Sequence, residues 1–302
     1  MADPSSKRDV IRRQWRALRP SRAELAGHTL EYADFGAGPA VLALHGGLGG
    51  YDQGALLGIA GFADWPNVRV LAPSRAGYLG TPVTAAEDFA AEADLHVHLL
   101  DRLGVGAAVV IAVSGGGPAA IQFAARHPGR CRGLILVSAC SGRLVVPDRY
   151  RPQFERMVRM SAIPPLRWMI ALMGRYAPEV AIRHSIPDAD LRRRTLADPE
   201  AGFLIRALQR STASRLRERI PGLMKDVSAD AAIDRLPIEA ISAPTLVIHG
   251  DADRVVPFAQ AEEVVRRCVA ASLLRIPRGD HLSLFTHLAD VRAASAVFLA
   301  HL

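Results

Sequence analysis

The sequence contains little cysteine, and its three cysteines are widely spaced, at Cys131, Cys140 and Cys268. Their number is odd, and they form no Cys-x-x-Cys pair and no spacing with histidine that is typical of zinc. This pattern excludes a small scaffold held together by disulfides, and it predicts no metal site. It fits a protein of a reducing compartment.

Long apolar runs are also missing. No stretch of about 18 apolar residues is free of charge, so no transmembrane helix is expected. The first 20 residues are basic, but they contain neither a continuous apolar core nor a small-residue cleavage site, which argues against a secretory signal. We predict a cytoplasmic protein without stable membrane insertion, and the sequence leaves its oligomeric state open.

Lysine is nearly absent. Lys7 and Lys225 are the only two lysines, and arginine supplies the rest of a formal net charge of +7. A biased composition explains this better than a nucleic-acid partner, because arginine is interleaved with Asp and Glu and no aromatic-rich RNA signature occurs. Residues 141–240 hold 18 Arg and Lys against 12 Asp and Glu, so most of the excess lies there. Residues 1–24 add about +4, which leaves the rest of the chain slightly acidic.

Short apolar segments alternate with helical patterns along most of the chain. A half-exposed strand is followed by fully apolar strands, which are typical of a sheet buried on both faces. The expected strands are 29–35, 41–44, 68–72, 107–113, 134–137, 244–250 and 272–276. The expected helices lie within 85–103 and 121–127, near 258–268 and around 291–302. This alternation predicts an α/β fold with a doubly wound, mostly parallel sheet.

The alternation stops in the middle of the chain. From 142 to 240 the pattern is helical and broken by prolines, and it resumes at residue 244. We therefore predict a helical lid, residues 142–240, inserted into a core formed by 25–141 and 241–302. Residues 1–24 are expected to form a basic N-terminal segment.

Ser114 follows a buried strand and is surrounded by small residues, in Ala112-Val113-Ser114-Gly115-Gly116. A strand that turns at once into a helix strains the backbone and leaves no room for side chains, as at a catalytic serine. Taken alone, this run is equally consistent with a phosphate loop or a plain turn. A catalytic serine needs a base, an acid that orients the base, and donors for the oxyanion.

Two later strand ends offer the acid and the base. In Gly250-Asp-Ala-Asp253-Arg-Val-Val-Pro257 the spacing favours Asp253 as the acid, with Asp251 shaping the turn. His281 lies in the loop that follows the last strand. Ser114, Asp253 and His281 therefore occur in the chain order Ser, Asp, His, which is one of the orders in which a catalytic serine, its acid and its base are found. The other histidines singled out are expected at a helix end or in packing and surface positions: His127, His184 and His287.

Backbone amides complete the set. His45-Gly46-Gly47 ends the first buried strand, a position from which a backbone amide can serve as the second oxyanion donor. We predict that Gly47 and Gly115 donate to the oxyanion, with Leu48 as the alternative to Gly47. The helix that follows Ser114 directs its positive dipole end at the same place. A glycine run that serves only as a connector is the competing interpretation.

These motifs resemble the α/β-hydrolase superfamily, in its lid-bearing branch of bacterial esterases, lactonases, perhydrolases and carbon–carbon-bond hydrolases. The resemblance covers about 28–140 and 240–302. It rests on the elements named above and on Tyr32, Gly36-Ala-Gly-Pro39 and Ser74-Arg75-Ala-Gly77-Tyr-Leu-Gly80-Thr81. It implies a Ser-Asp-His hydrolase that requires no metal or organic cofactor.

One departure and two further positions refine the resemblance. The family often has Asp where this chain has Ser74, so a local salt bridge is expected to be missing, and Arg75 is expected to be structural. Serine at position 114 argues against haloalkane dehalogenases and epoxide hydrolases, which use aspartate there. Leu48 replaces a proline that is typical of proline iminopeptidases.

Fold does not determine substrate, so the lid has to supply that information. Five of the six methionines lie in it, at Met157, Met160, Met169, Met173 and Met224, near Phe154 and Trp168. They are expected either to line an apolar pocket or to pack the lid on the sheet. The lid arginines are expected mainly to form a solvated face, with an acidic substrate or a membrane surface as alternatives: Arg192, Arg193, Arg194, Arg215, Arg217 and Arg219.

The expected activity is cleavage of a small, apolar carboxylic ester, thioester or lactone through an acyl-enzyme. One alternative is hydrolysis of a carbon–carbon bond in a vinylogous diketone. The other is a ligand-binding protein that uses the same scaffold without turnover.

Overall fold

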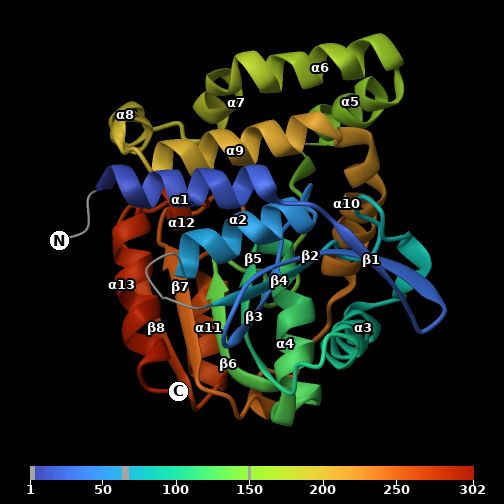
Figure 1. Ribbon diagram of the computed structural model, residues 1–302, viewed down its shortest axis with the longest axis vertical. Helices are drawn as coiled ribbons and strands as arrows, with labels where there is room; N and C mark the ends of the chain where they lie inside the picture. The colour runs from blue at the N-terminus through green and yellow to red at the C-terminus, as the bar shows by residue number, and fades with distance from the viewer. Residues whose placement is uncertain (1–3, 63–67, 149–150) are drawn as a thin grey trace.

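A computed structural model describes residues 4–62, 68–148 and 151–302, and its centre is a twisted sheet (Figure 1). In the part of the chain that the structure describes, this sheet has eight strands, in the order β1-β2-β4-β3-β5-β6-β7-β8. Their bounds are β1 Ser21–Leu25, β2 His28–Gly36, β3 Ala40–Leu44, β4 Arg69–Pro73, β5 Ala108–Val113, β6 Cys131–Val137, β7 Thr245–Gly250 and β8 Ala271–Ile276.

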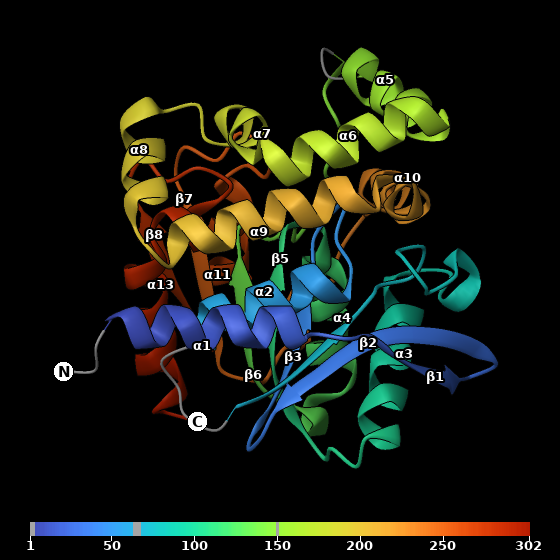
Figure 2. The same ribbon diagram turned by 45° about the horizontal axis from the view of Figure 1, so that its top comes forward.

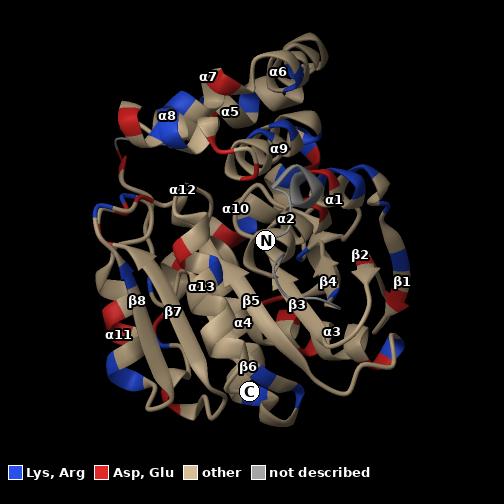
Figure 3. Cartoon of the chain, turned by 60° about the vertical axis from the view of Figure 1, so that its left-hand side comes forward, with Lys and Arg blue, Asp and Glu red and all other residues tan. Residues whose placement is uncertain are grey.

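Strands β3 to β8 run parallel to one another, and the antiparallel pairs of the described sheet are β1 with β2 and β2 with β4. This confirms the predicted mostly parallel sheet. The central strands β3, β5 and β7 contain no charged residue, and Figure 3 shows them in tan between charged helices and loops. Such strands need cover on both faces.

Helices supply that cover. Alternate residues of β3 point to opposite faces, so Val41 and Ala43 lie in one core cluster, and Leu42 and Leu44 in another. The helices outside residues 142–240 are α1 Pro4–Ala17, α2 Tyr51–Phe62, α3 Phe89–Arg102, α4 Gly117–Arg126, α11 Ala259–Arg267, α12 Ser283–Thr286 and α13 Leu288–Leu299. The first cluster includes α2, α12 and α13, and the second includes α3, α4 and α11. The sheet is therefore doubly wound, as predicted.

The N-terminal segment adds a strand to the sheet and a helix to one of its faces. β1 pairs with β2 in antiparallel register, with Ser21 opposite Tyr32, which adds a strand that the sequence pattern did not predict. α1 buries Ile11 in the cluster that also contains α2 and α9, and Arg12 lies over the ring of Phe203 in α9. The basic segment is thus packed against the remainder of the chain.

Residues 142–240, called the helical insertion below, run from the end of β6 to just before β7. Their helices are α5 Arg151–Ala162, α6 Pro164–Tyr176, α7 Pro178–Ser185, α8 Ala189–Ala197, α9 Ala201–Ser214 and α10 Leu216–Ala232. Figure 2 shows α9 between α6 and α2, so the insertion has an inner and an outer layer. Among the described helices, none is both long and apolar enough to cross a bilayer.

Candidate active site

Ser114 occupies the turn between β5 and α4. Its φ of +52° is a left-handed conformation that few non-glycine residues adopt, and it marks local strain. Its neighbours leave no free space: a Cβ on Gly46 would lie 2.8 Å from Cβ of Ser114, and one on Gly117 would lie 2.1 Å from the Cys140 oxygen. The N–H of Cys140 donates to the Ser114 carbonyl at 2.9 Å. Packing therefore requires glycine at positions 46 and 117.

His281 and Asp253 lie beside Ser114, each from a different strand end. The distance from Ser114 Oγ to His281 Nε2 is 3.0 Å, and that from His281 Nδ1 to Asp253 Oδ2 is 2.8 Å. A carboxylate only accepts, so Nδ1 carries the proton and Nε2 is free to accept the serine hydroxyl. The structure brings together the three side chains that the sequence spacing selected.

Asp253 is held in its ionised form. Burial alone raises the pKa of its carboxyl, but hydrogen bonds from His249 and His281 outweigh burial and hold the pKa well below its usual range. The amides of Val255 and Val256 also donate to its Oδ1, at 2.8 and 3.0 Å. Asp251 accepts instead from the amide of Arg278 and from Arg275, which agrees with a role in the turn.

His249, at the end of β7, contacts the Asp253 carboxylate, and sequence reasoning did not identify it. It is buried, and its Nε2 lies 3.0 Å from the Val256 carbonyl oxygen and 3.3 Å from Asp253 Oδ2. Both neighbours are acceptors, so Nε2 must carry the ring proton. The signal available in the sequence was a histidine within an otherwise apolar strand, four residues before Asp253.

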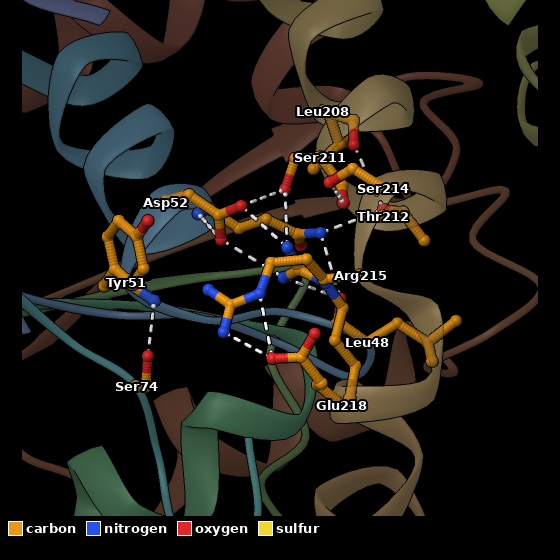
Figure 4. Close-up of polar contacts among 12 residues, drawn as sticks. Leu48, Tyr51, Asp52, Ser74, Leu208, Ser211, Thr212, Ser214, Arg215 and Glu218 are labelled. Carbon is orange, nitrogen blue, oxygen red and sulfur yellow. Dashed lines mark hydrogen bonds and ion pairs between the residues drawn. The ribbon is translucent and has the colours of Figure 1, made fainter. Parts of the chain in front are cut away.

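The two amides expected to bind an oxyanion are neighbours. A Cβ built on Gly115 would lie 3.7 Å from the nitrogen of Gly47. Leu48 has a φ of +57°, and its carbonyl accepts from Gln53 Nε2 at 3.0 Å and from Arg219 Nη1 at 3.4 Å. Figure 4 shows Leu48 with Asp52 and Ser211 in this network. The loop that carries Gly47 is therefore anchored by side chains.

Arg75 is buried, and it forms salt bridges although the neighbouring residue is Ser74 and not Asp. Its guanidinium bonds Asp226 twice, at 2.9 Å each, and its Nε lies 3.1 Å from Glu92 Oε1. Burial lowers the pKa of Arg75, but the charges of Asp226 and Glu92 outweigh burial and raise it well above its usual range. Ser74 instead donates to Glu31 Oε2 at 3.2 Å. Arg75 is structural, as expected, but its salt bridges come from distant segments.

His45 links Arg75 to the loop at residues 46–50, called the glycine loop below. Its Nε2 accepts from the amide of Arg75 at 3.0 Å, so its proton is on Nδ1, 2.7 Å from the Gly46 carbonyl oxygen. Burial and the charge of Arg75 lower the pKa of His45 to about 3. His45 is therefore a neutral structural group at physiological pH.

A cavity of about 630 Å³ opens beside His281. Its walls come from the insertion, at 144–147 and 184–191, and from the loops at 252–255 and 278–281. It combines apolar side chains such as Leu144 and Val255 with Arg254 and Arg278. A larger cavity of about 900 Å³ lies along β8 and α13, but Ser114, Asp253 and His281 do not line it. Of these three residues only His281 lines the smaller cavity, and we assign the site to that cavity on this contact.

The side chains singled out in the insertion take different positions. None of its five methionines lines the cavity beside His281, and Met169, Met173 and Met224 are exposed. Arg193 and Arg215 pair with Asp190 and Glu218 at the surface. Arg219 is fully buried and pairs with Asp52, so the expectation of a solvated arginine is wrong there. No cluster of three or more His, Cys, Asp or Glu in the described ranges could hold a metal ion.

Comparisons with known proteins agree with this fold. A model of the family described as "Alpha/beta hydrolase family" matches residues 41–294. A poly(3-hydroxyalkanoate) depolymerase of Ectopseudomonas oleovorans is 30% identical over 211 residues, 68% of this chain and 66% of that protein. A 2-hydroxymuconate semialdehyde hydrolase of Pseudomonas sp. (strain CF600) is 28% identical over 291 residues, 91% and 92% of the two chains.

A solved structure is similar over nearly the whole chain. It is an alpha/beta hydrolase fold protein from Nakamurella multipartita, with a TM-score of 0.82 and 28% identity. The match covers 93% of this chain and 99% of that one.

Proposed function

Because the chain belongs to the alpha/beta hydrolase family, we propose that it is a serine hydrolase that cleaves a carboxylic ester, thioester or lactone through an acyl-enzyme. The single observation that carries this proposal is the continuous contact from Ser114 Oγ through His281 to Asp253. Three such groups in hydrogen-bond distance are the arrangement that activates a serine hydroxyl.

In the first step Ser114 Oγ forms a bond to the carbonyl carbon, and its proton moves to His281 Nε2. The carbonyl oxygen becomes an oxyanion, which the amides of Gly47 and Gly115 bind. As the bond to the leaving alcohol or thiol breaks, His281 returns the proton to it. Water, deprotonated by His281, then attacks the acyl carbon and releases the acid and Ser114.

Asp253 holds His281 in the required tautomer throughout. The low pKa of its carboxyl keeps it anionic, so it orients the Nδ1–H group and stabilises the imidazolium that forms. The amides of Val255 and Val256 and the His249 ring fix this carboxylate in turn. Four contacts thus hold the Asp253 carboxylate.

The cavity beside His281 supports a small substrate that is partly apolar. Because residues 144–147 and 184–191 of the insertion form part of its wall, the insertion acts as a lid in this proposal. Arg254 and Arg278 at the same cavity suit a substrate that also carries a carbonyl or carboxylate group.

A fluorophosphonate probe tests the proposal directly. The wild-type protein should form an adduct on Ser114, located by peptide mass spectrometry, and Ser114→Ala should form none. Ser138→Ala is a matched control, because Ser138 is a buried serine at the end of β6 with a φ of +44°. A wild-type protein without an adduct on Ser114 would contradict the enzyme proposal and favour the ligand-binding alternative.

Hydrolysis of a carbon–carbon bond in a vinylogous diketone is the second candidate. It is favoured by the similarity to a 2-hydroxymuconate semialdehyde hydrolase over 91% of this chain. Assays of kcat/KM with a chain-length series of p-nitrophenyl esters and with a coloured ring-fission product would rank the two. A larger kcat/KM for the ring-fission product would replace the leading proposal.

A further inference from the structure

Helix α10 belongs to the insertion, yet two of its buried charged side chains pair with the core. Arg219 and Asp226 lie seven residues apart, on one face of the helix, and they pair with Asp52 and Arg75. We propose that Arg219 and Asp226 are positioning residues that hold the amides of Gly47 and Gly115 in place. This inference rests on the serine-hydrolase function proposed above.

Arg219 acts at the loop that carries Gly47. Its guanidinium donates to both carboxylate oxygens of Asp52, at 3.1 and 2.7 Å, and to the Leu48 carbonyl at 3.4 Å. Ser211 of α9 donates to Asp52 at 2.6 Å. Figure 4 shows Asp52, Ser211 and Leu48 in this cluster. One buried cation therefore joins α2, α9, α10 and the loop.

The backbone at Leu48 needs such an anchor. Its positive φ is unfavourable for a branched side chain, so contacts must hold it. The second donor to its carbonyl, Gln53 Nε2, also donates to Thr212 Oγ1 of α9 at 2.9 Å. Both donors thus connect Leu48, the residue next to Gly47, to the inner layer of the insertion.

Asp226 acts at Gly115. A Cβ built on Gly115 would lie 3.3 Å from Asp226 Oδ2, so the carboxylate lies directly against this residue. Tyr78 donates to the same oxygen at 2.6 Å, and Arg75 bonds both carboxylate oxygens. The Arg75 guanidinium also lies 3.4 Å from the His45 carbonyl oxygen. The Asp226–Arg75 pair therefore contacts both sides of the oxyanion site.

The backbone of α10 is also fastened to the core. The amide of Leu79 donates to the Glu218 carbonyl at 2.9 Å, and that of Gly222 donates to the Gly77 carbonyl at 2.8 Å. A Cβ on Gly77 would lie 2.7 Å from the Cα of Gly222, so two backbones meet here without side chains. This contact fixes α10 relative to the loop after β4. The charged side chains of α10 therefore keep a fixed position relative to the core.

A single and a double variant separate a positioning role of Arg219 from a purely stabilising one. Arg219→Met leaves the largely buried Asp52 carboxylate without its cationic partner and should lower the melting temperature strongly. Asp52→Asn combined with Arg219→Met removes both charges and should restore much of that loss. Leu48 still lacks its arginine donor in this double variant. Its kcat for a p-nitrophenyl ester should therefore stay about 10- to 100-fold below wild type, with KM changed far less.

Arg219→Lys and Asp226→Asn extend the test to variants that keep more of the local structure. Arg219→Lys retains the charge and should recover part of kcat, while Asp226→Asn should lower kcat about tenfold or more with a folded protein. Arg215→Met is the matched control, because Arg215 immediately precedes α10 and pairs with Glu218 at the surface. It should leave kcat close to wild type.

Two outcomes overturn the inference in distinguishable ways. A wild-type protein that is labelled at Ser114, together with a folded double variant of wild-type kcat, would overturn the positioning role alone. A wild-type protein that is neither labelled nor active would overturn the proposed function, and this inference with it.

Discussion

The surroundings of Ser114 and the outer face of α6 differ in how tightly contacts constrain them. At Ser114 even a methyl group on Gly46 would meet the backbone and Cβ of its neighbours. On α6 the large side chains of Trp168 and Tyr176 are 68% and 71% exposed, and Leu172 and Met173 are exposed as well. The first region holds the proposed reacting groups in place, whereas the second has few contacts that fix its side chains.

The boundary between the two regions runs through the insertion itself. Its inner helices, α9 and α10, share buried polar contacts with α2 and with the loop after β4. Its outer helices, α5 and α6, contact mainly α9, α10 and each other. Motion that admits a substrate is therefore expected in the outer layer, because the inner layer is tied to the site.

The largest effect is expected at His281. Replacement by Ala removes the group that accepts the Ser114 proton in the proposed mechanism, so kcat for ester hydrolysis should fall by about 10⁴- to 10⁶-fold. His287→Ala is the matched control, since His287 lies in the next turn and contacts Thr286 rather than Ser114. Equal losses in the two variants would contradict the distinction between the site and its surroundings.

Gly46→Ala tests how closely the core is packed at Ser114. The added Cβ would lie 2.8 Å from Ser114 Cβ and 3.1 Å from the Val113 oxygen, so it should displace the serine. We expect kcat to fall by about 10²-fold. Gly142→Ala is the control, because nothing lies within 4 Å of its Cβ position, and its kcat should stay at the wild-type value.

Asp230, on the inner side of α10, should make stability depend on pH. Burial and the charge of Asp226 raise the pKa of its carboxyl from 3.8 to about 7. Its stabilising contribution is complete below pH 3.8 and is lost as pH rises through about 7, where the buried carboxyl ionises. Asp230→Asn cannot ionise, so its melting temperature should exceed that of wild type by more at pH 8 than at pH 5. A constant difference between the two pH values would count against this assignment.

The smallest effect is expected on α6. Trp168→Ala removes a side chain that is 68% exposed, so the free energy of unfolding should change by less than about 0.5 kcal/mol. Phe123→Ala in α4 is the contrast, because Phe123 is fully buried and its loss should cost about 3–5 kcal/mol. Chemical denaturation of both variants measures the difference. A large loss for Trp168→Ala would mean that the outer layer is more constrained than its exposure indicates.

Much of the sheet could be predicted from the sequence, because buried parallel strands are short apolar runs bounded by turn residues. β1 could not, since Ser21–Leu25 is short and largely exposed, and only its pairing with β2 makes it a strand. Ser114, Asp253 and His281 could be selected because each follows a strand whose end lies at the same edge of the sheet. Their catalytic roles stay a prediction.

Long-range ion pairs could not be predicted. Arg215 and Arg219 occupy the same basic stretch, yet one pairs at the surface and the other is buried against Asp52, far away in the chain. Nothing local in the sequence separates them. The same holds for Asp226, whose partner Arg75 looked unpaired from its own neighbourhood alone.

The seam where Gly77 meets Gly222 also sets a rule for protein engineering. A chimera that exchanges residues 151–197 for those of another hydrolase replaces α5 to α8 and leaves α9, α10 and their buried partners in place. Exchange of the whole insertion would also remove Arg219 and Asp226 from beneath the glycine loop. Grafts that alter substrate choice should therefore end before α9.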